Sequence, residues 1–380
     1  MARRGSAVVV GFALLAGAVA LLAWNEGRAV RTARALDEGA RRVVEVDADR
    51  AVAAADGTLV HLVGEVAVTA PLRDAVTGVS REALRLRRTV ETLQWRRVSV
   101  GDDHDSRYDY RMEWSATRID SDAFPEAFRN PVALPLASAA LSSADARLAD
   151  FSLTTAVVEA FAEFEPVVLG AADVEAIAGT LGVTGVVLDG TVSTSGGGSV
   201  AYLSFAGGSP EAPRVGDARV RFDAVPTGTG SVVASKVGGR LEPYPTRSGV
   251  SIAFARLGVH GAAALFGEAV SQNRVLTNAL RGFGALLLVA AYRLTLGPLA
   301  AVAGLIPLLG GVARFGVMLV ALAFAGVTAL VTIAVAWLAF RPIVAAGLLA
   351  LAVAGVVALI RRPRSVAAPV SPRPPVSSRP

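Results

Sequence analysis

The stretch SAVVVGFALLAGAVALLAW, residues 6–24, contains no charged side chain. A helix of roughly 20 apolar residues is long enough to cross a bilayer. Arg3 and Arg4 precede the stretch, as in a signal peptide, but its apolar core is longer than that of a cleavable signal, and it ends at Trp24 without a small-residue cleavage site. The sequence therefore predicts an uncleaved membrane anchor over residues 6–24.

Acidic residues are confined to the middle of the chain. All 32 Asp and Glu residues lie between Glu26 and Glu268, whereas residues 269–380 carry arginine and no acidic residue. The net charge of +5 therefore comes from arginines close to apolar segments. The acidic middle shows no basic stripe with interleaved aromatic residues, which argues against a nucleic-acid partner. We expect a water-facing domain between a first membrane span and a group of later spans.

Hydropathy places three further spans behind this domain. The predicted fold class is α+β, with a mainly antiparallel extracytoplasmic domain in a four-span helical membrane protein. The predicted organisation is a cytoplasmic N-terminus (1–5), transmembrane helix 1 (6–24), the α+β domain (25–280), transmembrane helices 2 to 4 (283–303, 315–339 and 343–360) and a disordered cytoplasmic tail (361–380).

Arg293 leaves the second span open to two interpretations. If the span covers 283–303, Arg293 lies inside the membrane, where a charged residue is costly and normally faces protein or water. If the helix begins nearer Val275, Arg293 lies at the inner surface and residues 294–312 form a re-entrant or surface-lying segment.

The distribution of arginine predicts the orientation. Arg3, Arg4 and Arg314 fall on the side of the arginine-rich tail when the chain has four spans, and positive charges in short loops favour the cytoplasm. Both termini are then cytoplasmic and the large domain is extracytoplasmic. The chain has no cysteine, so neither disulfides nor free thiols can indicate the compartment. Its richness in Arg, Ala and Val is typical of a GC-rich bacterium, which indicates a bacterial plasma membrane.

The middle of the chain alternates as strands do. Residues 58–69 predict one strand, and 83–117 predict a long antiparallel hairpin with Trp95, Tyr108, Tyr110 and Trp114 on one face. Glycine-rich turns predict two further hairpins, over 185–205 and 218–237. Short helices are expected at 156–164 and 171–181, and a structured loop at the proline-rich segment 124–135.

Residues suited to catalysis or metal binding do not form a recognisable motif. The 3 histidines are isolated in the sequence, and no nucleophile elbow, zinc-protease motif or phosphate-binding loop occurs. The acidic turn at 102–105 could bind a hard cation or be a solvated hairpin tip. We therefore predict no catalytic, cofactor-binding or metal-binding residues and no cofactor.

Several motifs, in order along nearly the whole chain, resemble the transmembrane protein 43 (LUMA) family. They are WNEGRAV at 24–30, LRRTVE at 86–91 with Gln94 and Trp95 after it, FRNP at 128–131, GDARVRF at 216–222 and WLAFRP at 337–342. The resemblance implies four spans, a large lumenal or extracytoplasmic domain, no known enzymatic activity, self-association and the organisation of membrane protein complexes. One departure concerns the Asn-Pro pair, near which the family commonly has a histidine, whereas this chain has Arg129.

These motifs supply the candidate interaction or structural residues. For Glu26 and Arg28, the alternatives are an interfacial ion pair or helix anchor and a docking surface for a membrane partner. The expected partners are the lipid bilayer, a second copy of the chain and an unidentified membrane or envelope protein. We predict a non-enzymatic scaffold, and the alternative is a membrane-tethered envelope hydrolase acting on cell-wall or lipid substrates. The candidate residues are Trp24, Asn25, Glu26, Gly27, Arg28, Trp95, Asn130, Pro131, Arg293, Arg341 and Pro342.

Overall fold

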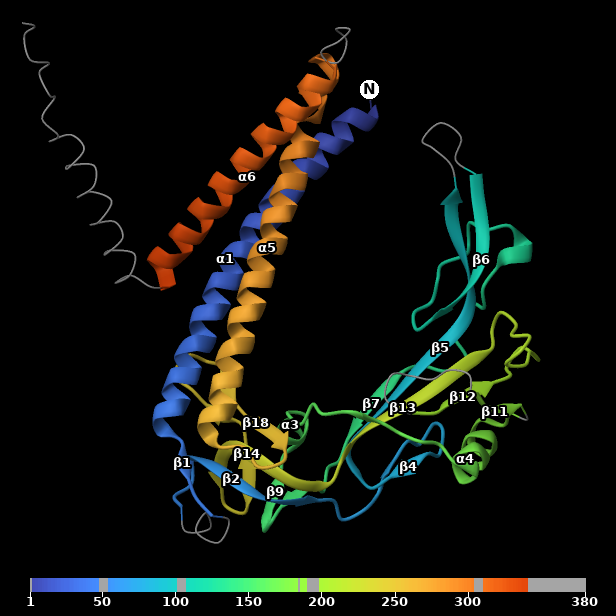
Figure 1. Cartoon of the computed structure of the whole chain (residues 1–380), viewed down its shortest axis with the longest axis vertical. Coiled ribbons are helices and arrows are strands. Elements are labelled where there is room, and N and C mark those ends of the chain that lie inside the picture. Colours follow the sequence, from blue (N-terminus) through green and yellow to red (C-terminus); the bar gives the residue numbers. More distant parts are fainter. Residues whose placement is uncertain are drawn as a thin grey trace, which may run out of the picture. The chain divides into compact units, whose positions relative to one another are not determined.

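The computed structural model describes residues 2–47, 54–100, 107–183, 185–189, 198–303 and 310–340. The chain divides into two compact units, a helical one within Met1–Arg31 and Gln272–Pro380 and a sheet-rich one within Thr32–Ser271 (Figure 1). Its mixed α and β content confirms the predicted α+β class. The acidic turn 102–105, residues Arg341 and Pro342, the fourth span 343–360 and the tail 361–380 lie outside the described residues.

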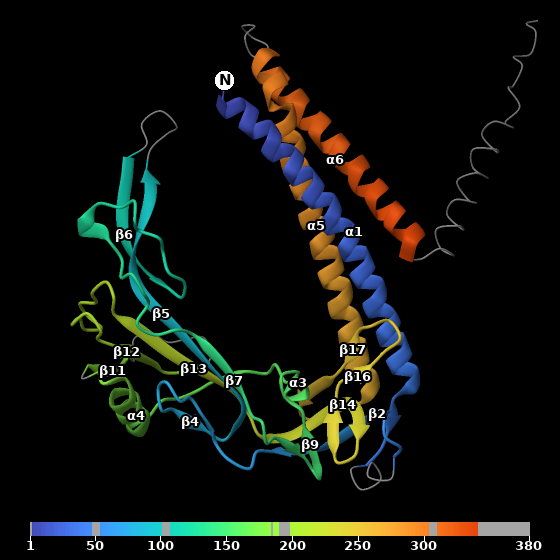
Figure 2. The same ribbon diagram turned by 180° about the vertical axis from the view of Figure 1, so that it is seen from behind.

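Three of the described helices are long and apolar enough to cross a membrane. They are α1 (Ala2–Arg42), α5 (Ala262–Ala303) and α6 (Gly310–Phe340). Figures 1 and 2, seen from opposite sides, both show α1 and α5 side by side. Helix α1 continues without a break beyond the apolar stretch, as the spacing of residues 28–46 predicts, although it ends at Arg42.

Small residues allow α1 and α5 to approach closely in the helical unit. A Cβ on Gly284 would lie 2.6 Å from Leu22 Cδ2, and one on Gly11 would lie 2.5 Å from Thr295 Oγ1. Leu22 is buried together with Leu288 in an apolar cluster that includes residues of α6. Since lipid provides little hydrophobic driving force between helices, this close packing is a main source of their association.

The first sheet of the sheet-rich unit contains seven strands in the order β1-β2-β8-β9-β15-β14-β18. An additional pairing between β2 and β14 closes five of these strands into a ring around an apolar core. Most neighbours are antiparallel, but β1 with β2 and β9 with β15 are parallel. The strands are β1 (Val44–Glu45), β2 (Thr58–Ala67), β8 (Arg147–Leu148), β9 (Phe151–Leu153), β14 (Gly228–Val237), β15 (Arg240–Glu242) and β18 (Phe254–Leu257).

The second sheet contains β11-β12-β13-β5-β6, with β10 paired to β13 and β7 to β5. Its strands are β5 (Ala83–Val100), β6 (Arg107–Ser115), β7 (Ala139–Ser142), β10 (Glu165–Pro166), β11 (Val186–Asp189), β12 (Val200–Leu203) and β13 (Ala218–Pro226). Shorter elements complete the unit: β3 (Leu72–Arg73), β4 (Ser80–Arg81), β16 (Tyr244–Pro245), β17 (Ser251–Ile252), η1 (Glu126–Phe128), α3 (Thr155–Val158) and α4 (Ala171–Leu181).

Two predicted hairpins are confirmed and one is wrong. Strand β5 pairs with β6, and β11 with β12, in antiparallel register as predicted. The segment 218–237 does form two strands, but β13 belongs to the second sheet and β14 to the first. Only Thr227 separates them. The Pro and Gly residues that suggest a turn accompany a register shift at Val225/Pro226, so the chain passes from one sheet to the other without reversing on itself.

Candidate functional site: a polar cluster among three apolar helices

The motif at the end of the first apolar stretch turns its polar side chains inward. On α1, Asn25 is 0% exposed and Glu26 is 1% exposed, whereas Trp24 is 55% exposed. Because successive residues of a helix are about 100° apart, Asn25 and Arg28 share a face, while the preceding tryptophan points elsewhere. Charged and amide groups buried in this way need hydrogen-bonding partners.

The carboxylate of Glu26 connects all three helices. Arg281 of α5 donates from Nε to Glu26 Oε1 at 2.6 Å and from Nη2 to Oε2 at 2.8 Å. The indole Nε1 of Trp337, on α6, donates to Oε2 at 2.9 Å. A two-pronged arginine contact of this kind fixes the orientation of both groups as well as their distance.

Asn25 and Arg28 form a second set of bonds, between α1 and α5. Asn25 Nδ2 donates to the carbonyl of Thr277 at 3.0 Å. Arg28 donates to Asn273 Oδ1 and to Thr277 Oγ1, both at 3.0 Å, and to Asn25 Oδ1 at 3.2 Å. Asn273 Nδ2 donates in return to the carbonyl of Ala29 at 3.2 Å. We call the seven residues Asn25, Glu26, Arg28, Asn273, Thr277, Arg281 and Trp337 the interhelical polar cluster.

Gly27 lets α6 approach α1 beside this cluster. A Cβ at this position would lie 2.8 Å from Cζ of Phe340. The glycine in the motif therefore leaves room for an aromatic ring to pack against the helix backbone.

The cluster is suited to holding helices together. Its carboxylate accepts three hydrogen bonds, two of them from a guanidinium group, and these bonds offset the cost of burying the charge. The sequence predicts Glu26 and Arg28 as a possible ion pair, but in the structure Glu26 pairs with Arg281 and Arg28 bonds to amide and hydroxyl groups.

Four members of the cluster are not predicted as site residues from the sequence. Asn273, Thr277 and Arg281 recur at intervals of four residues, so they form a polar stripe on one face of α5. This stripe is visible in the sequence, but its partners are about 250 positions earlier in the chain. Trp337 belongs to a motif of the family resemblance. Arg293 is exposed on α5, about three helical turns beyond Arg281, and does not join the cluster.

Two further candidates, Trp95 and Asn130, meet in the second sheet. Asn130 is 8% exposed; its Oδ1 accepts from the backbone N of Trp95 at 2.6 Å, and its Nδ2 donates to the carbonyl of Trp95 at 3.0 Å. The ring of Phe128 packs edge-on against Trp95 and stacks on Tyr110 at 4.3 Å. The loop containing Asn130 and Pro131 is therefore fastened to the β5–β6 hairpin.

The histidines within the described residues bond to backbone carbonyls. His61 Nε2 lies 2.8 Å from the carbonyl oxygen of His260, and the His260 Nε2 lies 2.9 Å from that of Leu257. Ser231 Oγ donates to the carbonyl of Gly258 at 2.7 Å. These groups lie near one another, but the serine hydroxyl has no bond to an imidazole ring in this arrangement, unlike the nucleophile of a catalytic triad. Among the described residues, no group of three potential metal ligands occurs.

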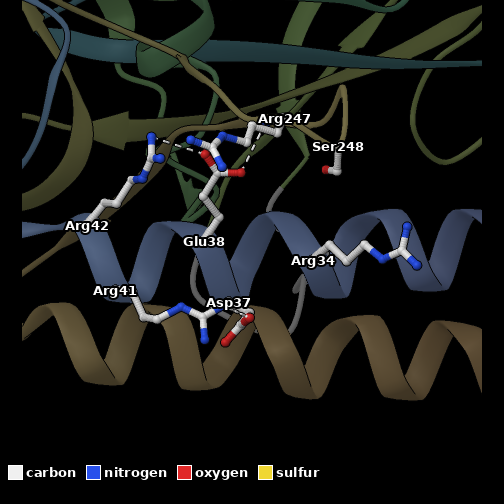
Figure 3. A pocket seen from close by; sticks show the side chains of 7 residues that line it. All are labelled: Arg34, Asp37, Glu38, Arg41, Arg42, Arg247 and Ser248. Carbon is white, nitrogen blue, oxygen red and sulfur yellow. Dashed lines mark hydrogen bonds and ion pairs between the residues drawn. The ribbon is translucent and has the colours of Figure 1, made fainter. Parts of the chain in front are cut away.

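A polar hollow of about 460 Å³ occurs in the sheet-rich unit (Figure 3). Glu38 lies at its centre, where Oε1 pairs with Arg42 at 3.2 Å and Oε2 accepts from the backbone N of Arg247 at 3.1 Å. Figure 3 shows Arg41 turned towards Asp37. The hollow contains more guanidinium than carboxylate groups, so its charge is suited to an anion. It is lined by Arg34, Asp37, Glu38, Arg41, Arg42, Arg247 and Ser248.

Comparison with known proteins gives one consistent result. The family model described as "Transmembrane protein 43" matches residues 90–342. Transmembrane protein 43 of Rattus norvegicus is 27% identical over 347 residues, which cover 86% of this chain and 82% of that protein. The Homo sapiens protein of the same name is 27% identical over 344 residues, 85% and 82% of the two chains. A Drosophila melanogaster homolog is 35% identical over 131 residues, 31% of this chain and 35% of that protein. No solved structure matches the chain.

Proposed function

Because the chain belongs to the transmembrane protein 43 family, we propose that it is a non-enzymatic membrane scaffold. It self-associates in the bilayer and organises other membrane or envelope proteins through its sheet-rich domain.

The interhelical polar cluster is the observation that best supports this proposal. Glu26, Arg281 and Trp337 use charged and polar groups to fix three helices relative to one another. A transporter or channel needs polar groups facing a conduit, whereas here the buried groups bond to each other. A helical unit held together in this way presents a constant apolar outer surface, which on α6 includes the exposed side chains of Phe315 and Leu330.

We place the scaffold in a bacterial plasma membrane with the sheet-rich domain outside and both termini in the cytoplasm. The placement of arginine supports this orientation. It requires a fourth span at 343–360, after α1, α5 and α6, to return the tail to the cytoplasm.

The alternative function, an envelope hydrolase, lacks a supporting observation among the described residues. Ser231 and His260 are close in space, but Ser231 Oγ accepts a bond from the backbone N of His260 and donates to a carbonyl. A hydrolase needs the serine hydroxyl to donate to the ring of a histidine.

The oligomeric state of the purified chain tests the proposal. We expect the full chain in lipid nanodiscs or mild detergent to migrate as an oligomer by light scattering, and crosslinking in native membranes to trap both copies of the chain and a second membrane protein. The chain should not react with a fluorophosphonate probe for serine hydrolases. A strictly monomeric chain or covalent labelling by the probe would contradict the proposal.

A further inference from the structure

Strand β6 lies at the end of the second sheet. It follows β5 in the strand order and pairs with β5 along its whole length, Arg107–Ser115. Within the described residues, no other strand pairs with its outer edge. A free edge of nine residues exposes a row of backbone donors and acceptors that another strand can join.

The bonds on the far side of β5 show which residues of β6 face this free edge. The backbone N and O of Trp95 bond to the side chain of Asn130, and those of Leu93 bond to Asp217 O and Gly216 N. Odd-numbered residues of this part of β5 therefore direct their backbone groups away from β6, so even-numbered residues direct theirs towards it.

The register carries this alternation across to β6. The even-numbered Arg96 and Val98 are opposite Arg111 and Asp109, so these odd-numbered residues of β6 bond to β5. Tyr108, Tyr110 and Met112 therefore direct their N–H and C=O groups to the free edge. Consistently, the N–H of Tyr110 donates to the carboxylate of Asp109 at 3.1 Å.

The side chains along this edge alternate in charge and are accessible. Arg107, Asp109, Arg111 and Glu113 form a plus-minus-plus-minus series on one face of β6. The side chains of Asp109 and Arg111 are 55% and 68% exposed. On the other face, Tyr108 and Met112 are about half exposed. Proteins often protect an edge strand with lysine or proline, and β6 has neither.

We propose that β6 pairs antiparallel with β6 of a second copy of this chain, with Tyr110 opposite Tyr110 of the partner subunit. In this register Arg107 is opposite Glu113 of the partner subunit, and Asp109 is opposite Arg111 of the partner subunit. Each charged residue then meets an opposite charge. The inference deepens the proposed self-association and rests on it, because it names the surface and the register.

The charge series excludes the neighbouring registers. Sliding one strand by two residues places Asp109 opposite its own counterpart in one direction and Arg111 opposite its own counterpart in the other, and like charges directly opposite are unfavourable. A shift of one residue turns the aromatic face of one strand to the charged face of the other. If the two β6 strands paired in parallel and in register, every charged residue would lie opposite a residue of the same charge.

The aromatic face is also matched in this register. Tyr108 is opposite Met112 of the partner subunit, and Tyr110 is opposite its own counterpart. These residues direct their backbone groups to the edge, so they supply the hydrogen bonds between the copies, while Asp109 and Arg111 form the closer, non-hydrogen-bonded pair. Sulfur–aromatic and charge contacts across strands each add modest stability.

Cysteine pairing tests the register directly, because the chain has no native cysteine. The variants Asp109→Cys and Arg111→Cys are prepared separately as full chains, mixed in detergent and oxidised gently. We expect a disulfide-linked dimer in the mixture and little in either variant alone. In the proposed register the 109–111 pair has Cα atoms about 4.5 Å apart, whereas identical residues are about 8 Å apart, too far for a disulfide. Glu126→Cys, an exposed residue outside β6, serves as the control for random collision.

Charge reversal provides an independent test that separates contacts between copies from contacts within one copy. Arg111→Glu alone opposes Glu to Asp109, and Asp109→Arg alone opposes two arginines, so each variant should self-associate about tenfold more weakly. A mixture of the two variants restores opposite charges at both positions and should associate like the wild type. Thermal unfolding of each variant checks that the domain remains folded.

The outcomes separate this inference from the proposed function. A disulfide only in the mixture, with restored association on mixing the charge variants, supports β6 pairing. The β6 interface is overturned if the chain forms a stable oligomer without a 109–111 disulfide and if neither charge reversal weakens that oligomer. Self-association through the spans would then remain the explanation of the oligomer. A monomeric chain in membrane and detergent overturns both.

Discussion

Glu26 shows how a single residue can organise the helical unit. Its carboxylate is almost fully buried and accepts from two different helices, so its removal leaves the guanidinium of Arg281 without its main partner. The sequence places Glu26 at the end of an apolar stretch and suggests an interfacial role. It does not show that the partners are Arg281 and Trp337, because no local pattern links positions so far apart in the chain.

We predict that Glu26→Ala destabilises the helical unit by about 2–3 kcal/mol, since it removes three hydrogen bonds to a charged group and leaves a partly buried cation. Trp337→Phe, which removes the indole N–H bond and keeps a smaller aromatic ring, should cost about 1 kcal/mol. The melting temperature of the full chain in detergent, followed by thermal aggregation, compares both variants with the wild type. Trp24→Phe, an exposed residue of the same motif, is the matched control. Equal melting temperatures for Glu26→Ala and the control would show that the cluster is not stabilising.

We expect the folding stability of the sheet-rich unit to depend on pH because of Asp173. The two bonds from Arg81, both 2.7 Å, hold the pKa of its carboxyl below the ordinary value, and a third bond comes from the backbone N of Gly170. A carboxyl whose pKa is lowered by folding stabilises the protein above its unfolded pKa of about 3.9, and this contribution disappears as the pH falls through the folded pKa.

Asp173→Asn should therefore lower the free energy of unfolding at neutral pH by about 1 kcal/mol, through loss of the ion pair and of the cap on α4. The wild type should lose this advantage as the pH falls below about 4, so that the two unfolding curves converge. Urea unfolding followed by circular dichroism between pH 3 and 7 measures the difference. A gap that stays constant across this range would contradict the assignment.

Among the elements, strands are better predicted than their pairing. Alternating residues identify β5 and β6, and a polar turn between them makes a hairpin the natural result. Residues 218–237 carry a similar local signal, with Pro226 and Gly228 between two alternating runs. There the pairing is decided by strands more than 100 positions earlier in the chain: β13 pairs with β5, and β14 pairs with β2. The aromatic face of the β5–β6 hairpin is correctly predicted, but its degree of burial is not, because Phe128 covers only part of it.

The loop that contains Asn130 gives a prediction at the scale of an element. Its side-chain amide donates to the carbonyls of Trp95 and Ile119, and a carboxylate cannot do so. Asn130→Asp should therefore cost about 1–3 kcal/mol and release the loop from β5. Faster proteolysis of the hairpin and a red shift of tryptophan fluorescence would report the release. Arg129→Ala, next to it in the loop, is the control, and equal effects for both variants would contradict a specific bond.

On the scale of the whole molecule, three long apolar helices and a sheet-rich unit are established, and the sequence predicts both. The apolar stretches and the confinement of acidic residues to 26–268 are sufficient to predict this division of the chain. The reason is that a bilayer constrains the composition of a segment more than its specific contacts. The interhelical polar cluster is only partly foreseeable: the motif on α1 attracts attention, whereas its partners on α5 depend on how two helices cross.

Topology is tested by cysteines introduced at chosen positions. We expect Glu126→Cys, exposed in the sheet-rich unit, to react with a membrane-impermeant maleimide in intact spheroplasts, and Ser378→Cys to react only after lysis. Four spans place these positions on opposite sides of the membrane. Labelling of Ser378→Cys in intact spheroplasts would show an odd number of spans.

The passage of the chain from β13 straight into β14 has a consequence for synthesis on the ribosome. Strand β2 must wait for β14, which lies roughly 170 residues later, and translation at about 5–20 residues per second makes that delay on the order of 10–30 s. During this interval β2 lacks its partner β14, and the first half of β5 lacks β13, although β5 can already pair with β6. The nascent domain is therefore exposed to wrong strand pairing after the first helix is made, and it can close its first sheet only shortly before the second apolar helix emerges.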